Sequence, residues 1–381
     1  MNQYSAKVFD TIDSITTDDW KSLNPTNNTY FNPEFLKAFE TSNPNISFKY
    51  ILIYDDHKAV GLANIQIITL GIDVILKNIK ISDFAKNTIR FLLCKYPFKI
   101  MFCGNVFLSG EHGIVLNPNI NKKKAFLVVS KALTDLSNSK ENRPLHAIFV
   151  KDFYQESLHI TDHLLNYKYM KMPVEPNMIF ELNSDWKNYE NYTAALKSKY
   201  RVKVNKADST SSRLITKLFN EDDFETYKNE LQQLYENTIA NASFNAQVLN
   251  LNTYNKLRAL YKEDFIVKAY FLENKLVGFL SALSNNNHLD AHFIGLDYKL
   301  NKTYAIYPRI LNDYVRLGIE RNVSQINFGR TASEIKSTIG AIPENLVCYT
   351  RHRHNFINKL LNPFIGQVKI KDFKQHEPFK V

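Results

Sequence analysis

The chain has 381 residues, 44% of them hydrophobic and 13% aromatic, which excludes a disordered protein and provides for two domains of roughly 150–200 residues. Lys and Arg outnumber Asp and Glu 48 to 38, a net charge of +10, so we expect an acidic partner: nucleic acid, anionic lipid, an acidic carrier protein or a phosphorylated small molecule. The three cysteines, Cys94, Cys103 and Cys348, show neither paired nor metal-ligand spacing, which disfavours disulfides and a zinc site and favours a reduced, cytoplasmic setting.

The first half of the sequence alternates helical and strand patterns. They predict a helix at 33–41 behind Asn32-Pro33, a hairpin at 48–70, a strand near 73–80, a helix at 82–95, a strand at 98–103, a helix at 121–138 and a strand at 145–150. Asn105, Glu111 and His112 lie on a glycine-rich loop after the strand at 98–103. Polar loops of this kind often carry sites, so these three residues are candidate substrate-binding residues, although a structural loop is the simpler interpretation.

The second half gives a clearer order. Its patterns predict a basic helix at 191–207, helices at 220–239 (capped by Asn220) and 252–262, strands at 265–272, 276–284 and 288–296, a helix from Pro308 to about 321, and strands at 324–328 and near 346–351. Helices, an antiparallel meander and then alternating helices and strands are typical of an α+β fold with a mixed sheet.

Two stretches of the first half reappear in the second. "YDDHKAVGLA" (54–63) aligns with "FLENKLVGFL" (271–280), which places Gly61 over Gly278, and "KIMFCGN" (99–105) aligns with "SQINFGR" (324–330). The matches keep the same order along the chain. They predict a duplicated domain, with domains at 1–165 and 166–381.

This order, with "ENKLVGFLSALSNNNHLDAHFIGLDY" as its hairpin and central strands, resembles the GNAT superfamily of acyltransferases. The duplication, the basic "ALKSKYRVKVNKA" and the closing "FGRTASEIKSTIGA" resemble the Fem-type transferases and their relatives, which include peptidoglycan-bridge aminoacyltransferases and bacterial lipid N-acyltransferases. The resemblance implies two tandem GNAT-like domains, each a mixed, mostly antiparallel sheet flanked by helices. It also implies N-acyl transfer with acyl-CoA or acyl-carrier protein as co-substrate and no permanently bound cofactor.

One departure from the GNAT pattern concerns the donor. Typical members hold the CoA pyrophosphate on a glycine-rich turn before a helix, whereas "GLDYKLNKTYAIYPR" (295–309) has no glycine between Asp297 and Pro308. The missing backbone cradle favours carrier-bound donors, such as acyl-carrier protein or charged tRNA.

Aminolysis of a thioester needs a neutral amine and a group that takes its proton. In "HLDAHFIGL", alternation places His288, Asp290 and His292 on one face and Leu289, Ala291 and Phe293 on the other. His292 is the candidate base and Asp290 a candidate substrate-binding residue. A half-buried histidine bonded to Asp290 or a backbone carbonyl is the alternative.

The segment "GRTASEIKSTIG" contains a capping-box spacing, Thr331 and Glu334, that leaves Arg330 and Lys336 unexplained. The Fem-type resemblance implies that Lys336 is a catalytic residue that neutralises or orients a charged acyl or phosphate group, with Arg330 as a substrate contact. A solvated helix face is the alternative.

Four further residues are substrate-binding candidates. Tyr304 and Tyr307 would line the substrate cleft that the resemblance implies. Lys197 and Arg201 fall on one face of the basic helix, which suits a phosphate or a lipid headgroup, although charge runs are usually solvated.

Membrane contact, if any, is expected to be peripheral, because the N-terminus lacks a signal-peptide pattern and no apolar run approaches the ~20 residues that span a bilayer. The tail "CYTRHRHNFINKLLNPFIGQ" (348–367) mixes basic and apolar residues. It suits either a membrane surface or packing on its own domain.

Taken together, these features predict an N-acyltransferase, catalytic in its second domain, whose acceptor is an amine-bearing lipid such as a sphingoid or sulfonolipid precursor. The first alternative is an aminoacyl-tRNA-dependent peptidoglycan-precursor transferase, the one case that needs nucleic acid. The second is a non-catalytic protein that binds lipid or cell-wall precursors.

Overall fold

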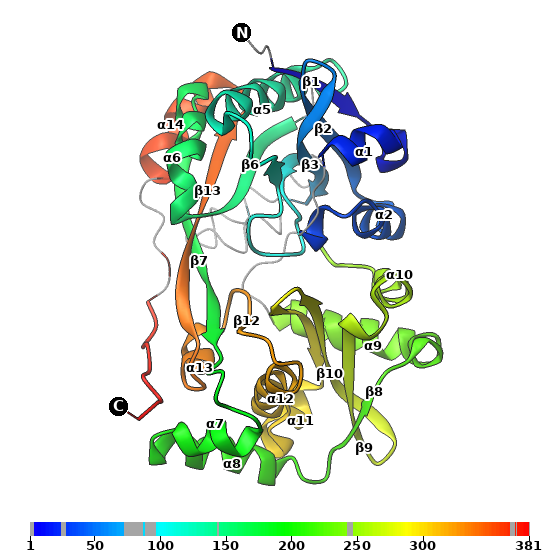
Figure 1. Ribbon diagram of the computed structural model, residues 1–381, viewed down its shortest axis with the longest axis vertical. Coiled ribbons are helices and arrows are strands. Elements are labelled where there is room, and N and C mark those ends of the chain that lie inside the picture. Colours follow the sequence, from blue (N-terminus) through cyan, green and yellow to red (C-terminus); the bar gives the residue numbers. More distant parts are fainter. Residues whose placement is uncertain are drawn as a thin grey trace. The chain divides into compact units, whose positions relative to one another are not determined.

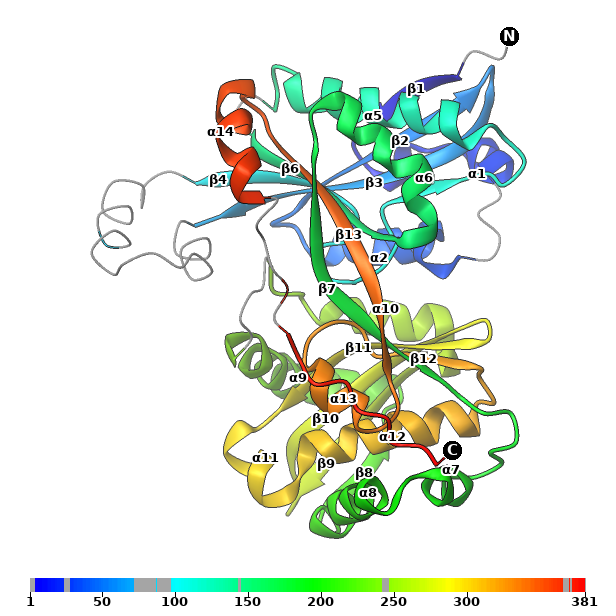
Figure 2. The same cartoon turned by 90° about the vertical axis from the view of Figure 1, so that its left-hand side faces the viewer.

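The computed structural model describes residues 4–23, 28–71, 87, 97–142, 145–241, 247–365, 370 and 372–380. The chain divides into two compact units (Figure 1). Unit 1 comprises Met1–Val174, Ser243–Leu249 and Asn345–Ile370, and unit 2 comprises Glu175–Ala242, Asn250–Glu344 and Lys371–Val381. This differs from the expected division after residue 165, because the first boundary between the units falls within the long strand β7 (Met170–Glu181), and a later one falls within β13 (Ile342–His352) (Figure 2).

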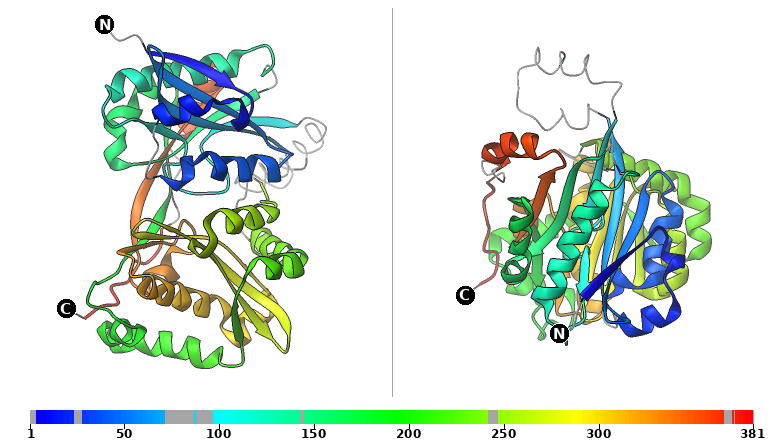
Figure 3. Two further views of the ribbon diagram at one scale, coloured as in Figure 1. Left: turned by 45° about the vertical axis from the view of Figure 1, so that its right-hand side comes forward. Right: turned by 90° about the horizontal axis from the view of Figure 1, so that it is seen from above.

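Unit 1 is a mixed sheet with strand order β1-β2-β3-β4-β6-β13. Figure 3 shows α5 and α6 on one face of this sheet and α1 and α2 on the other. Its elements are β1 (Tyr4–Phe9), α1 (Thr17–Leu23), α2 (Pro33–Ser42), β2 (Ser47–Asp55), β3 (Lys58–Leu70), β4 (Phe98–Cys103), β5 (Ile114–Leu116), α5 (Lys122–Asn138), β6 (Leu145–Tyr154), α6 (Leu158–Thr161) and α14 (Asn355–Ile365), with short 3-10 helices at Ile12–Ser14, Thr29–Phe31, Gln155–Ser157 and Asp162–Tyr167.

The elements expected from the first half are confirmed where the structure describes them. Asn32 caps α2, its side chain accepting a hydrogen bond from the Glu34 amide at 2.9 Å. The expected strand near 73–80 and helix at 82–95 fall, position 87 aside, outside the described residues. The expected strand near 346–351 belongs to unit 1, because β13 pairs with β6.

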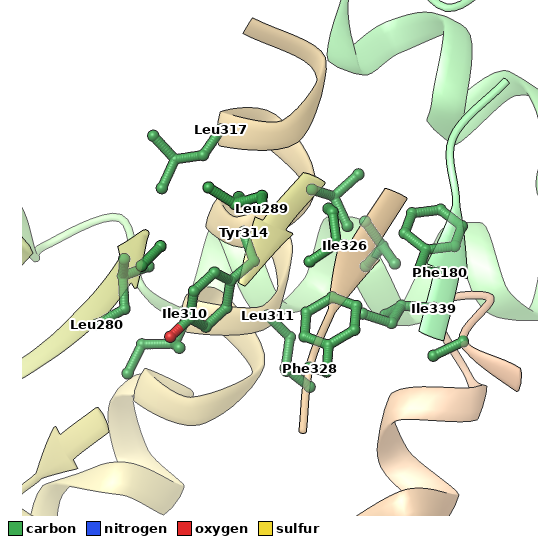
Figure 4. Close-up of a cluster of buried hydrophobic side chains, with 14 of the residues drawn as sticks. Phe180, Leu280, Leu289, Ile310, Leu311, Tyr314, Leu317, Ile326, Phe328 and Ile339 are labelled. Atoms are coloured by element: carbon green, nitrogen blue, oxygen red, sulfur yellow. The ribbon is translucent and has the colours of Figure 1, made fainter. Parts of the chain in front are cut away.

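Unit 2 repeats this plan with strand order β8-β9-β10-β11-β12-β7. One face of the sheet packs on α12 and the first helices of the unit, and Figure 4 shows Ile310, Leu311 and Tyr314 of α12 against Leu280, Leu289 and Ile326. The elements are α7 (Tyr189–Ala195), α8 (Ser198–Thr210), β8 (Ile215–Leu218), α9 (Glu221–Asn241), α10 (Asn252–Tyr261), a 3-10 turn (Lys262–Asp264), β9 (Phe265–Leu272), β10 (Lys275–Asn285), β11 (His288–Leu296), α11 (Tyr298–Tyr304), α12 (Ile306–Glu320), β12 (Gln325–Asn327) and α13 (Ser333–Ser337). The α+β prediction is confirmed.

Two helix predictions in unit 2 are wrong in detail. The basic helix at 191–207 is two helices, because the extended backbone of Leu196 (ψ 142°) bridges to Phe379 and buries the leucine side chain. Pro308 is not the first helical position, since α12 begins at Ile306 behind Ala305, whose left-handed backbone (φ 47°) separates it from α11.

The predicted capping box is also wrong. Thr331 and Ala332 both have positive φ (64° and 50°), and α13 begins after Ala332 without a side-chain cap. An N-cap side chain needs an extended backbone to reach the helix amides, which a left-handed residue does not provide. Glu334 instead approaches the Nε2 atom of His376 at 3.6 Å.

The duplication extends to register. Gly61 pairs with Leu116 as Gly278 pairs with Leu296, so the alignment of 54–63 with 271–280 is confirmed. The alignment of 99–105 with 324–330 is wrong. β4 lies antiparallel to β3 and parallel to β6, which makes it the counterpart of β11, whereas β12 is the counterpart of β6. Many buried parallel strands end in a glycine, so the sequence match alone assigned β12 to the wrong strand of the first unit.

Candidate functional site

In unit 2, the parallel strands β11 and β12 pair over three residues and then part. The last register pair is Asp290 with Asn327, after which β11 continues to Leu296 beside β10. We call this point the strand divergence of unit 2. The carboxyl ends of diverging parallel strands are a common ligand position in α/β sheets.

A β-bulge marks the same point. Leu280 pairs with Ile294 and Ala282 with Ala291, so one residue of β10, Ser281, faces two residues of β11, His292 and Phe293. The Ser281 hydroxyl accepts a hydrogen bond from the Phe293 amide (3.0 Å) and donates one to the Phe293 carbonyl (2.8 Å). The bulge is therefore closed by a side chain.

The bulge corrects the predicted alternation of β11. Leu289 and Ala291 pack on the α12 side of the sheet as expected. The Phe293 ring instead lies 5.1 Å from the Tyr235 ring of α9, on the opposite face. The extra residue shifts the strand by one position, so Phe293 follows His292 to the α9 face.

His292 lies at this bulge. The residue is half-buried and its Nδ1 atom is buried, and its ring centroid lies 6.2 Å from that of Phe265. Asp290, two residues earlier, is within 3.5 Å of the Asn285 side-chain amide. The structure thus brings His292, Asp290 and the segment after Asn327 to one edge of the sheet. A half-buried imidazole at such an edge has the position that a general base requires.

Lys336 holds the turn that follows β12. Its side chain is 5% exposed, and Nζ donates hydrogen bonds to the carbonyls of Phe328 (2.8 Å), Gly329 (3.2 Å) and Arg330 (2.7 Å). Burial lowers the pKa of Lys336 to about 7, opposed by the Glu175 carboxylate. The solvated-face interpretation is therefore wrong. All three N–H donors are used within the protein, so Lys336 positions the backbone that carries Arg330.

Tyr304 and Tyr307 follow β11 in the chain, Tyr304 as the last residue of α11 and Tyr307 in the first turn of α12. The Tyr304 hydroxyl accepts a hydrogen bond from Arg213 at 3.4 Å, and burial raises the pKa of Tyr307. The helix starts here are already occupied, since the Asp297 side chain caps α11 and the Asn301 side chain accepts from the Tyr307 amide (2.8 Å).

Lys197 and Arg201 lie away from this edge. The C-terminal part of α8 packs beside α12, where Asn312 donates to the Val204 carbonyl. Lys197 precedes Val204 by two helical turns, about 10 Å along the axis, and its ammonium donates to the Glu377 carbonyl at 3.0 Å.

Unit 1 has the corresponding divergence, with a longer excursion. Ile65 pairs with Cys103 and Ala63 with Ile114, so a single residue, Asn64, faces the whole segment Gly104–Gly113, which we call the inserted loop. Both ends of the loop bond to the backbone of Asn64. The backbone N–H of Asn64 donates to the Gly113 carbonyl (2.8 Å), and its backbone carbonyl accepts from the Gly104 amide (2.9 Å). The loop replaces the two-residue bulge of unit 2.

The inserted loop carries the three residues predicted from the sequence. The Asn105 side chain accepts from the Phe107 amide at 2.9 Å, and Glu111 accepts from the Tyr154 amide at 2.7 Å. Burial raises the pKa of Glu111 and lowers that of His112 to about 4, where Asp152 opposes the shift and Lys151 adds to it.

A lysine holds this loop as well. Lys151 donates to the carbonyls of Asn105 and Leu108 and lies 3.4 Å from the fully buried carboxylate of Asp152. Asp152 has a left-handed backbone (φ 64°) at a second bulge, where β6 passes Cys348 of β13. The pair Lys151–Asp152 follows Val150, the residue that pairs with Cys103.

Sequence analysis missed Asn64 and Gln66, which are 1% and 0% exposed on β3. A signal was present: "LANIQIITL" places two amides at alternate positions of an otherwise apolar strand. Lys151 and Asp152 gave no comparable signal, because adjacent charges at a strand end resemble an ordinary turn. Among the described residues, no group of three or more His, Cys, Asp or Glu side chains is placed to hold a metal ion.

The comparisons with known proteins agree with this fold. No protein-family model and no curated protein sequence matches the chain. The crystal structure of FemX matches with a TM-score of 0.51 and 10% identity, over 93% of this chain and 100% of that one. A tandem GNAT protein from the clavulanic acid biosynthesis pathway, solved without AcCoA, matches with a TM-score of 0.51 and 8% identity, over 92% and 99%. The chain therefore has the tandem GNAT fold, as the resemblance implied.

Proposed function

We propose that the protein is an N-acyltransferase that moves an acyl group from a thioester to the primary amine of a long-chain amino-lipid, such as a sphingoid or sulfonolipid precursor. The observation that carries the proposal is the strand divergence of unit 2, with half-buried His292 at the bulge. The tandem GNAT fold supports the same class of chemistry.

The reaction assigns one role to each group. The amine nitrogen bonds to the thioester carbonyl carbon, the carbon–sulfur bond breaks, and the proton lost by nitrogen passes through the His292 imidazole to the leaving sulfur. Arg330, on the turn that Lys336 holds, is the candidate contact for a negative group on the substrate. Asp290, Tyr304 and Tyr307 are further proposed substrate contacts.

The donor is proposed to be carried by a protein. Asp297 caps α11 with a carboxylate, and the Asn301 side chain accepts from the Tyr307 amide at the start of α12, so both helix starts are partly occupied and suit a pyrophosphate poorly. Together with the absence of glycine between Asp297 and Pro308, this favours acyl-carrier protein over free acyl-CoA.

The acceptor is proposed to be a lipid because of α14. Phe356 and Leu360 are 74% and 56% exposed on this helix, whereas Asn358 is buried; its side chain accepts from the His352 amide and donates to the Lys168 carbonyl, both at 2.8 Å. The helix is thus anchored by a polar side chain with its apolar residues outward. The sequence has no acidic residue between Glu344 and Asp372, so an anionic membrane surface is the complementary partner. Among the described residues, no helix is long and apolar enough to cross a membrane.

A direct test supplies palmitoyl-carrier protein, palmitoyl-CoA or a charged tRNA together with sphinganine, and detects the amide by mass spectrometry. We expect N-palmitoyl sphinganine with the carrier-protein donor and slower formation with CoA. Product with charged tRNA alone would replace the proposal by the peptidoglycan-precursor alternative. Tight binding without product across all donors would favour the non-catalytic alternative.

The membrane part has its own test, co-sedimentation with phosphatidylglycerol and phosphatidylcholine vesicles. We expect binding to the anionic vesicles that weakens about tenfold in Phe356→Ser/Leu360→Ser and falls with salt. Val202→Ser, which removes a 61% exposed valine from the basic helix α8, is the matched control and should bind as the wild type does. Equal binding of all three proteins would refute the role of α14.

A further inference from the structure

Unit 1 buries polar atoms that the proposed chemistry of unit 2 does not use. Among the described residues, the Asn64 Oδ1, Gln66 Nε2 and His112 Nδ1 atoms are buried without a hydrogen-bond partner. An unpaired buried polar group costs about 1–3 kcal/mol, so three around one loop are costly unless a ligand or water satisfies them. At the matching position of unit 2, the Ser281 hydroxyl is fully used.

The three side chains lie on one face of the sheet. Asn64 and Gln66 are two residues apart on β3, so they point to the same side, about 7 Å apart. Asn64 pairs with Tyr50, whose hydroxyl donates to Glu40 of α2, which identifies this side as the α2 face. The His112 ring packs against the Tyr30 ring with centroids 3.9 Å apart and the planes tilted by 38°, and Tyr30 packs against Phe35 of α2.

The inserted loop brings these groups together. His112 precedes Gly113, whose carbonyl accepts a hydrogen bond from the backbone N–H of Asn64. At the other end of the loop, the Val106 backbone N–H donates to Gln66 Oε1 at 2.9 Å. The His112 ring is half-buried, so one edge of the cluster reaches the surface. The proposed point of entry for a ligand is therefore at His112.

The unused atoms define a hydrogen-bond pattern. Asn64 Oδ1 is an acceptor and Gln66 Nε2 a donor. In the tautomer that carries its proton on Nε2, the buried His112 Nδ1 atom is a second acceptor. The site offers two acceptors and one donor.

From this pattern we propose that unit 1 binds an uncharged primary amine at Asn64, Gln66 and His112. A neutral amine has two N–H donors and one lone pair, which complements the three atoms. An ammonium would face Gln66 without a lone pair to offer it, and an alcohol would leave one acceptor unpaired. The nearby charged groups already have partners: Lys151 and Asp152 lie 3.4 Å apart, Glu111 accepts from the Tyr154 amide, and Glu40 accepts from the Tyr50 hydroxyl. The preference for a neutral amine therefore rests on the hydrogen-bond pattern.

The inference is independent of the transfer reaction, and it gives unit 1 an amine site in addition to the one proposed for unit 2. If unit 2 proves inactive, the amine site of unit 1 is still measurable by binding. If unit 1 binds nothing, the proposal for His292 is unaffected.

Isothermal titration of the full chain with octylamine tests the site, with octanol as the matched ligand. Alkylamines have a pKa near that of lysine, about 10.4, so between pH 7 and 9 the apparent Kd should fall about tenfold per pH unit as the neutral fraction rises. His112 stays neutral throughout this range, because its pKa is about 4. A pH-independent Kd, or equal affinity for octanol, would overturn the proposal.

Variants tie the binding to the three atoms. His112→Phe keeps a ring against Tyr30 but removes Nδ1, and Gln66→Glu keeps the acceptor for Val106 but removes the amide donor. Each should weaken octylamine binding about tenfold or more at pH 9. Val202→Ser, which changes an exposed residue of α8, should leave the affinity unchanged. No binding by the wild type, as when buried water alone fills the site, or unchanged binding in both folded variants, would overturn the inference.

Discussion

The two strand divergences solve one geometric problem in different ways. Both units let a strand leave its parallel partner beside a single residue of the preceding hairpin, Ser281 in unit 2 and Asn64 in unit 1. In unit 2 a two-residue bulge is closed by hydrogen bonds of the serine hydroxyl. Unit 1 instead inserts Gly104–Gly113, and side-chain polar atoms beside this loop have no hydrogen-bond partner among the described residues. The difference teaches that a duplicated fold can keep its register and still assign separate chemistry to the same point.

A shared device accompanies the difference. In each unit a largely buried lysine donates to backbone carbonyls of the segment beside the divergence: Lys336 to Phe328, Gly329 and Arg330, and Lys151 to Asn105 and Leu108. The two lysines come from different positions in the repeat. The common requirement is an irregular backbone whose carbonyls need donors.

Replacing the glycines beside each divergence should have the largest effect on the stability of the protein. A Cβ at Gly295 would lie 2.3 Å from Phe279 and 2.8 Å from the Leu234 backbone, and one at Gly113 would lie 2.9 Å from the Cys103 carbonyl. We expect Gly295→Ala and Gly113→Ala to destabilise the protein by about 3 and about 2 kcal/mol. Gly71→Ala, which meets nothing within 4 Å, is the control and should stay within about 0.5 kcal/mol in urea unfolding. Equal stability of all three variants would refute the tight packing.

Replacing each lysine measures how much it stabilises the backbone segment that it holds. Lys336→Met leaves three carbonyls without their donor and should lower the free energy of unfolding by about 2 kcal/mol. Lys151→Met, which leaves two carbonyls, should cost about 1 kcal/mol. Urea unfolding monitored by tryptophan fluorescence measures both, and a larger loss for Lys151→Met would contradict the assigned roles.

The pKa of Lys336 gives the smallest and most specific effect. Its folded value of about 7 is below its unfolded value of about 10.4, so between these limits the unfolded chain binds more protons and stability rises with pH. The wild type should gain up to about 1.4 kcal/mol per pH unit relative to Lys336→Met between pH 7 and 9. Below pH 6 the difference between the two proteins should be constant. Parallel curves over the whole range would show that Lys336 stays protonated.

Much of the fold could be predicted from the sequence, because periodicity and caps act locally. Asn32 before α2 and Asn220 before α9 both cap their helices, and the hairpin repeat aligned Gly61 with Gly278 in the register that the strands have. The predictions failed where distant contacts override local ones. Leu196 leaves the helix to pair with Phe379, and the bulge at His292 reverses the face of Phe293.

In the candidate sites, too, the residues with a local signal could be predicted and those placed by distant contacts could not. His292 and His112 could be found as histidines beside strands, and both lie at divergences. The partners that define unit 1's site, Asn64 and Gln66, belong to a different strand, and only the fold of the inserted loop places His112 on their face. Lys336 carried a family expectation of substrate contact, while its burial against three carbonyls could not be read from its neighbours in sequence.

The central claim, that His292 at the divergence of unit 2 carries the transfer, is tested most directly by the rate of amide formation in two variants of one strand. His292→Ala should lower kcat by about a hundredfold or more, the usual contribution of a general base. His288→Ala, which removes an exposed histidine four residues earlier on β11, should leave kcat within about twofold. Full activity in His292→Ala, or equal losses in the two variants, would contradict the account.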